Sequence, residues 1–147
     1  MKPIEAAGKI FSLQVCPGHR KPMQAAQQVE LLENLGIKDD RHALRDSSRQ
    51  VLLLEKETLD DLRLTPGEAK ENITTTGIHL MTLQRKQRLQ LGNEVILEIT
   101  QACSPCSRME EIRSGLLKEI AGKRGMLARV IRGGSLQRGD FIKTVKQ

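Results

Sequence analysis

The chain has 147 residues and a net charge of +6, with 24 Lys and Arg against 18 Asp and Glu, and its aromatic residues are two phenylalanines. This length suits one domain with a real hydrophobic core, so residues 1–147 are interpreted as a single domain. The longest aliphatic runs are far too short to span a membrane, and the first residues lack the apolar stretch of a signal peptide, so we expect a cytoplasmic protein. The basic surplus indicates an anionic ligand, but the shortage of aromatic rings disfavours an RNA-binding module.

The N-terminal third contains one clear strand and one ambiguous segment. Apolar and polar residues alternate over residues 9–15, which predicts a strand that ends at the turn 16–19. Residues 25–35 are rich in Gln, Ala, Glu and Leu, which favours a helix, although a strand stays open. Residues 36–46 are polar and charged and predict a loop.

The remaining segments predict mostly short strands. Residues 49–55 are densely aliphatic and predict a buried strand, followed by a short acidic helix over 55–64. Near the C-terminus, residues 126–131 and 141–145 predict a pair of strands joined through glycines. Together these segments predict a mainly β (α+β) fold, a closed or nearly closed β-barrel with two or three peripheral helices.

Residues 89–100 predict a β-hairpin whose register follows from the residues that must be buried. A two-residue turn would place apolar residues opposite charged ones on the same face. A three-residue loop at 92–94 instead pairs Leu91 with Val95. We therefore predict the three-residue loop.

A helix is predicted over residues 109–120, where apolar residues recur at helical spacing. Its start can be interpreted in two ways. Ser107 and Glu110 have the spacing of a capping box, whereas Ser104 followed by Pro105 would put proline at the favoured first position of the helix.

Cys106 is the best candidate for a reactive or metal-ligating sulfur. Either start of the helix places it at the positive helix end, beside Arg108, and both features favour a thiolate. Cys103 adds a second sulfur at Cys-x-x-Cys spacing, so dithiol redox chemistry, half of a zinc site and a single active thiolate all stay open, beside an ordinary structural role. A structural Cys₃His zinc module would add Cys16 and His19, but a chain this rich in aliphatic residues does not need a metal to fold.

Several motifs, in order over residues 30–142, resemble the MOSC domain, the module found at the C-terminus of molybdenum-cofactor sulfurases and in small free-standing proteins. The most specific match is residues 71–78, Glu-Asn-Ile-Thr-Thr-Thr-Gly-Ile, similar to the family's Glu-Asn-Ile/Leu-Thr-Thr-x-Gly. Two positions depart from the family, since Asp39 and either Lys86 or Gln87 stand where it usually has glycine. The other matching segments are residues 36–43, 49–54 with Glu57, 66–67, 91–92, 105–106, 128–134 and 139–140.

The resemblance implies a barrel of the pyruvate-kinase-barrel type that binds molybdenum-molybdopterin or carries sulfur as a cysteine persulfide. Whether it acts alone in sulfur transfer or as part of a molybdenum-dependent reductase stays open. The implied partners are a sulfur donor such as a cysteine desulfurase, and molybdenum-cofactor enzymes or biosynthesis proteins. Cys106, with Cys103, would act as the thiol, and Cys106 would ligate the metal. The residues implied to bind the cofactor are Arg41, His42, Arg49, Glu71, Asn72, Thr75 and Arg129, with Arg132 as a further cation.

Overall fold

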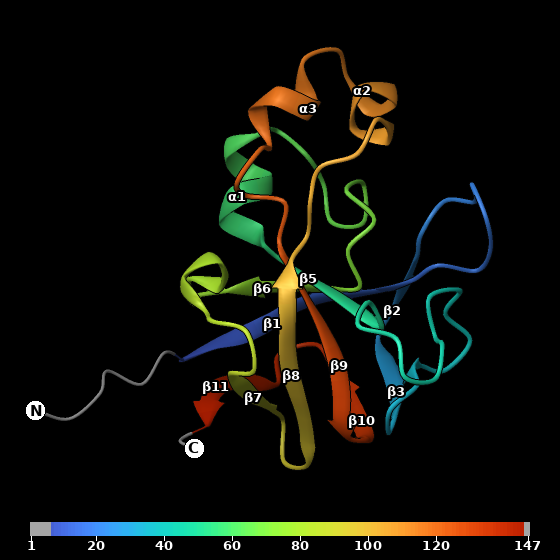
Figure 1. The fold of residues 1–147 in the computed structure, drawn as a ribbon, viewed down its shortest axis with the longest axis vertical. Helices are drawn as coiled ribbons and strands as arrows, with labels where there is room; N and C mark the ends of the chain where they lie inside the picture. The colour runs from blue at the N-terminus through green and yellow to red at the C-terminus, as the bar shows by residue number, and fades with distance from the viewer. Residues whose placement is uncertain (1–6, 146–147) are drawn as a thin grey trace, which may run out of the picture.

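Seven strands close into a β-barrel, and short helices gather at one end of it (Figure 1). The computed structural model describes residues 7–145. In chain order the elements are β1 (Ala7–Val15), β2 (Gln24–Ala26), β3 (Gln28–Leu32), β4 (Gly36–Ile37), β5 (Val51–Glu55), α1 (Lys56–Asp61), β6 (Ile73–Thr76), the 3₁₀ turn η1 (Leu80–Thr82), β7 (Arg88–Leu91), β8 (Val95–Ala102), α2 (Arg108–Ile112), α3 (Leu116–Glu119), β9 (Met126–Arg132), β10 (Gly134–Gln137) and β11 (Phe141–Val145).

The barrel is formed by a sheet with the strand order β11-β7-β8-β9-β5-β6-β1-β2, in which β11 also pairs with β1. That pairing closes the ring and leaves β2 outside it. The pair β5–β6 is parallel, and the other pairs are antiparallel. A smaller sheet, β10-β3-β4, lies beside the barrel. The predicted mainly β barrel with peripheral helices is confirmed.

Strand β5 explains why the helices cover this part of the barrel. Its four aliphatic residues are all buried, so both faces of the strand are covered. Val51 and Leu53 join the aliphatic cluster that fills the barrel interior. Leu54 packs with the apolar residues of α1, α2 and α3 on the outside. Leu52 belongs to a third, small cluster on that outer side, which becomes important below.

The hairpin β7–β8 has the predicted register. Leu91 lies opposite Val95 and Leu89 opposite Leu97, and all four side chains are buried. The three-residue loop is therefore confirmed. Gly92, its first residue, has φ of +62°, a conformation in which glycine avoids the steric penalty of a side chain.

The ambiguous segment 25–35 forms strands, so the helix that its composition favours does not form. In β3, Val29 and Leu31 are buried, while Gln28 and Glu30 between them are exposed. This alternation gives the strand one apolar face, and β3 pairs with β10. Tertiary pairing therefore outweighs the helix propensity of the individual residues.

The strand pair predicted in the C-terminal third is wrong in part. The strands predicted at 126–131 and 141–145 both form, as β9 and β11, but they do not pair with each other. Strand β9 pairs with β5 and β8, whereas β11 pairs with β1 and β7. The chain between them forms β10 and joins the smaller sheet. The prediction paired these two strands because they are close in the sequence. In the structure, closure of the barrel decides which strands pair.

The helix predicted over 109–120 is broken into α2 and α3. Gly115, between them, has φ of +88°. The capping box is absent, since Ser107 makes no side-chain hydrogen bond to the helix. The Glu110 carboxylate instead accepts hydrogen bonds from the backbone N–H groups of Gly115, at 3.0 Å, and Leu117, at 2.9 Å. This carboxylate holds the break in place, so neither segment exceeds five residues.

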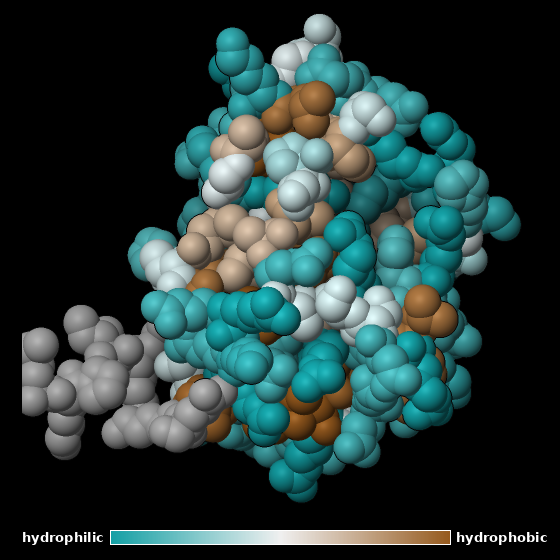
Figure 2. Space-filling model, in the orientation of Figure 1, coloured by the Kyte–Doolittle hydropathy of each residue, from teal (hydrophilic) through white to brown (hydrophobic). Residues whose placement is uncertain are grey.

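Hydrophilic residues cover most of the face shown in Figure 2. Exposed large hydrophobic side chains among the described residues are Phe11, Leu44 and Phe141. No helix in residues 7–145 is long and apolar enough to cross a membrane.

Candidate functional site: a basic pocket beside two cysteines

A pocket of about 290 Å³ lies against the outer side of the barrel wall. Its buried lining includes Leu52 of β5 and Leu127 of β9, which pack with Cys103. Met109, at the start of α2, adds a further apolar side chain. Because the barrel interior is filled by a separate aliphatic cluster, the pocket is an external site and not a barrel cavity.

Positive charge dominates the pocket. Among the described residues, no Asp or Glu lines it. The pKa of His19 is held below its ordinary value, chiefly by the charge of Arg41 and less by burial and by Arg108 and Arg20. Such a field attracts anions. Arg20 is partly neutralised by an exposed ion pair with Glu111, at 3.5 Å. The lining cations are Arg20, Lys21, Arg41, Arg49, Lys70, Arg108 and Arg124.

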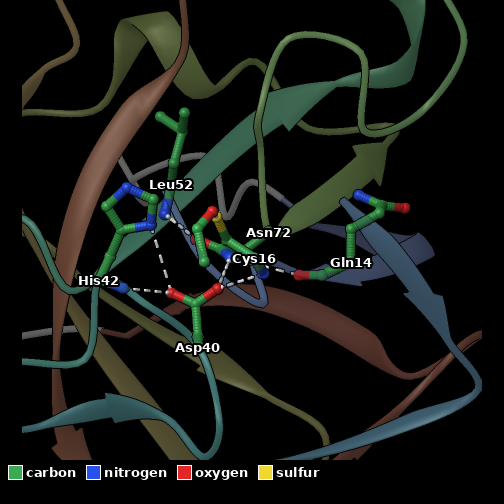
Figure 3. Close-up of polar contacts among 7 residues, drawn as sticks. Gln14, Cys16, Asp40, His42, Leu52 and Asn72 are labelled. Carbon is green, nitrogen blue, oxygen red and sulfur yellow. Dashed lines mark hydrogen bonds and ion pairs between the residues drawn. The ribbon is translucent and has the colours of Figure 1, made fainter. Parts of the chain in front are cut away.

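Asp40 holds three pieces of the pocket wall together (Figure 3). Its side chain is fully buried, and its Oδ1 accepts hydrogen bonds from the backbone N–H of Cys16, at 2.6 Å, and from Nδ2 of Asn72, at 3.1 Å. Its Oδ2 accepts from the backbone N–H of His42, at 3.0 Å, and lies 3.4 Å from His42 Nδ1. One carboxylate thus ties the loop after β1, the 36–46 loop and the start of β6 to one another.

Asn72 is held by the same network. Its Oδ1 accepts the backbone N–H of Leu52, at 3.0 Å, and its Nδ2 also donates to the carbonyl of Gln14, at 3.2 Å. Both amide hydrogens and the amide oxygen therefore have protein partners. Asn72 lines the pocket, but its side chain acts as a strut between β1, β5 and Asp40 (Figure 3).

The structure brings together six of the site residues singled out from the sequence. The residues that line the pocket are Arg41, His42, Arg49, Asn72, Cys103 and Cys106. The other four lie elsewhere. Glu71 and Thr75 are buried and outside the pocket lining, Arg129 bonds to Glu98 on the neighbouring strand, and Arg132 is exposed near the end of β9.

Glu71 supports the fold beneath the pocket. Its Oε2 accepts hydrogen bonds from the backbone N–H of Gly67, at 3.0 Å, and from Oγ1 of Thr74, at 2.8 Å. Its Oε1 is buried without a partner among the described residues. Burial raises the pKa of this carboxyl, because the charged form loses its hydration.

The two clustered cysteines differ in environment. Cys103 is buried against Leu52 and Leu127, whereas Cys106 is exposed and lines the pocket with Arg108. All three cysteines are free thiols. The helix after Cys106 is only five residues long, so it contributes less to the local potential than the predicted long helix would. The basic lining supplies the positive field instead.

The residues considered for zinc converge on the same pocket. Cys16 and His19 line it together with Cys103 and Cys106, although the two pairs are far apart in the sequence. In the described part of the chain, however, no three His, Cys, Asp or Glu side chains are grouped closely enough to hold a metal ion.

Sequence reasoning missed the roles of two residues. Asp40 lies in the matching segment 36–43, but it was assigned no role, because its burial depends on partners 24 and 32 positions away. Arg124 was assigned no role, yet it is 4% exposed and lines the pocket. A charged residue two positions before the buried strand β9 was the available signal.

The two departures from the family's glycines are accommodated. Asp39 has φ of +69° and Lys86 has φ of +74°, so both positions keep the left-handed backbone that favours glycine. Aspartate tolerates this conformation better than most residues do, and the loop takes its path without glycine at position 39.

Comparisons with known proteins agree with this architecture. The MOSC domain model matches residues 38–143. The YuaD protein from Bacillus subtilis superposes with a TM-score of 0.81 at 16% identity, covering 98% of this chain and 99% of that one. YiiM from Geobacillus stearothermophilus gives 0.77 at 18% identity, covering 95% and 75%, and YiiM from Escherichia coli gives 0.67 at 18%, covering 99% and 71%. No curated protein gives a significant match. The chain belongs to the MOSC domain family, which is related to the molybdenum-cofactor sulfurases.

Proposed function

We propose that this protein binds the molybdenum-pterin cofactor in the basic pocket, with Cys106 as its sulfur contact. The observation that carries the proposal is the combination of a lining without carboxylates and an exposed thiol in one external pocket. A phosphorylated pterin is an anion, and a thiolate is a suitable ligand for a thiophilic metal. The family's link to the molybdenum cofactor selects this ligand among other anions.

The exposed residues of the pocket would bind different parts of the ligand. Arg41 and Arg49 present guanidinium groups, which recognise phosphate through paired hydrogen bonds. Cys106 would ligate molybdenum, which when bound supplies two-electron redox chemistry. Arg108 lines the pocket together with this thiol and adds to the positive charge of the lining. Asn72 and Asp40 would position the wall, because their polar side-chain atoms already have partners within the protein.

A second candidate function is that of a sulfur carrier. It is favoured by the exposure of Cys106, which leaves the thiol accessible to a partner protein. Its thiolate would attack the terminal sulfur of a persulfide on a donor such as a cysteine desulfurase. A new S–S bond forms on Cys106, and the donor's cysteine leaves as a thiolate. The sulfur would then pass to molybdenum-cofactor enzymes or biosynthesis proteins. This step needs no external oxidant, because the transferred sulfur is already at the persulfide level.

The test is the molybdenum, zinc and pterin content of the protein purified from a host supplied with molybdate. The wild type is compared with Cys106→Ser, Cys103→Ser and Arg49→Gln, and with Arg129→Gln as a control outside the pocket. We expect molybdenum and pterin in equal amounts in the wild type and in the control. Both should be reduced in Arg49→Gln, and molybdenum should be lost in Cys106→Ser.

Two results separate the alternatives. Sulfur released by cyanide from the wild type and absent from Cys106→Ser, without molybdenum in either, would favour the carrier function. Stoichiometric zinc that disappears on changing Cys16 or Cys106 would overturn both functions, since the thiols would then be structural.

A further inference from the structure

Arg124 is a buried cation without a partner. Only 4% of the residue is exposed, and its guanidinium forms no hydrogen bond or ion pair with any residue that the structure describes. Nε and Nη1 are fully covered. Nη2 is not among the fully covered atoms and has no hydrogen-bond partner among the described residues, so it is the nitrogen of this pocket-lining residue that a ligand can reach.

The protein does not neutralise this charge. A guanidinium stays protonated in proteins, and buried charges are normally paired. The Arg124 charge acts on the Glu71 carboxyl, lowering its pKa against the larger effect of burial, but no ion pair forms between them. Among the described residues, Glu71 Oε1 likewise has no hydrogen-bond partner, and no carboxylate lines the pocket. An anion bound in the pocket would supply the ion-pair partner that Arg124 lacks there.

The backbone around Arg124 is fixed. Gly125 has φ of +105°, and a Cβ built there would lie 2.3 Å from the carbonyl oxygen of Leu53 in β5. The carbonyl of Gly125 accepts the backbone N–H of Cys103, at 2.9 Å. The backbone beside Arg124 is thus held between the barrel wall and the cysteine segment. A buried side chain on a held backbone has fewer conformations to lose when it binds a ligand.

The surroundings strengthen an electrostatic contact at this point. Leu52, Leu127 and Cys103 are all buried and form the apolar part of the lining beside Arg124. A charge contact made among apolar groups is stronger than one made in water. The exposed cations Arg41 and Arg49 lie in solvent, and their contacts are weaker and more sensitive to salt.

We propose that Arg124 forms the inner oxyanion subsite of the pocket, a site for a tetrahedral dianion of the phosphate class. This deepens the proposed function, on which it rests for the identity of the complete ligand. At about 290 Å³ the pocket has room for a larger group outward of the oxyanion, beside Cys106. The same chemistry serves a phosphate monoester at the end of a cofactor or a free inorganic oxyanion.

The experiment is a titration of the full chain with inorganic phosphate at low ionic strength, measured by calorimetry. In parallel, the Arg124 Nε–Hε resonance of the wild type is followed by NMR. The variants are Arg124→Gln and Arg124→Lys, with Arg129→Gln as a matched control. Arg129 is partly exposed, paired with Glu98 and outside the pocket. We expect the resonance to shift on binding, and phosphate affinity to fall at least about tenfold in Arg124→Gln, which corresponds to about 1.4 kcal/mol. Arg124→Lys should bind more weakly than the wild type, because an ammonium lacks the guanidinium geometry.

Unchanged phosphate affinity in Arg124→Gln, or an Arg124 resonance that does not move, would overturn the subsite. Arg49→Gln is titrated as well. If Arg49→Gln lost phosphate binding while Arg124→Gln kept it, the ion would bind at the exposed cations and not at Arg124, and the subsite would be overturned. If Arg124→Gln fails to fold, the shift of the wild-type Arg124 resonance on phosphate addition still tests whether phosphate binds at Arg124.

Glycerol 3-phosphate provides the second arm of the titration. Tighter binding of this monoester than of inorganic phosphate supports the subsite as the end of a larger ligand site. The reverse order supports it as a site for a free oxyanion. The subsite and the cofactor-binding function can fail separately. If Arg124→Gln kept its full molybdenum and pterin content, only the subsite would be refuted. If phosphate binding required Arg124 but the wild-type protein contained no molybdenum, only the cofactor-binding function would be refuted.

Discussion

Replacing Asp40 with Asn tests whether one carboxylate holds the pocket wall together. The carboxylate accepts three hydrogen bonds: at Oδ1 from the backbone N–H of Cys16 and from Asn72 Nδ2, and at Oδ2 from the backbone N–H of His42. An asparagine amide can keep its oxygen toward the two donors at the Oδ1 position. Its NH₂ group then faces the backbone N–H of His42, and one hydrogen bond is lost.

The cost follows from the number of lost bonds. Each hydrogen bond to a charged acceptor contributes about 1.5–3 kcal/mol, so we expect Asp40→Asn, which loses one, to lower the free energy of unfolding by about 1.5–3 kcal/mol. For a chain of this size, that corresponds to a fall in Tm of roughly 3–12 °C. Asp39→Asn is the matched control, because Asp39 is exposed and asparagine tolerates its φ of +69°.

Urea unfolding followed by circular dichroism is the appropriate assay, since the chain has no Trp or Tyr for fluorescence. Asp39→Asn should stay within about 0.5 kcal/mol of the wild type. If Asp40→Asn were as stable as Asp39→Asn, the carboxylate would not be the link between the three wall segments, and the account of the site geometry would be wrong.

Three further predictions follow from the same structure. Burial raises the pKa of Glu71 above its ordinary 4.5, so the native state holds this proton more tightly than the unfolded state does. Wild-type stability should therefore increase relative to Glu71→Gln as the pH falls through the folded pKa toward 4.5, and a pH-independent difference in urea midpoints would contradict this. Gly125→Ala should cost at least about 2 kcal/mol from backbone strain and a steric clash, against about 1 kcal/mol for Gly122→Ala, which meets no neighbouring atom. Equal melting temperatures for the two would be inconsistent with the close approach at Gly125. NMR titration should place the His19 pKa below 6.5 and show it rising in Arg41→Gln, and an unchanged value would mean that Arg41 does not dominate the local field.

Local patterns in the sequence were sufficient for the hairpin and for the central strand. Leu91 and Val95 specify their register because a slip would expose one and bury a charge. Residues 51–54 are apolar on both faces, which already indicates a strand covered on both sides. These features depend on neighbours within a few positions, so the sequence is enough to predict them.

The errors occurred where distant partners decide the structure. Segment 28–32 is a strand because β10, over a hundred residues away, pairs with it. Arg124 is buried because Gly125 lets the chain pass close to β5, and nothing in the composition of that segment indicates the approach. The family resemblance identified Arg41 and Arg49 but could not indicate that Asp40 links Cys16, His42 and Asn72, since a motif does not record which oxygen faces which donor.

The position of the pocket outside the closed ring has an evolutionary consequence. The aliphatic residues that stabilise the ring point inward, whereas the cations that would select a ligand lie in loops and on the outer wall. Substitutions at Arg41, Arg49 or Lys21 therefore leave the packed interior untouched. Members of such a family are free to exchange one anionic ligand for another without refolding the scaffold, provided that Asp40 and the residues that it ties together are retained.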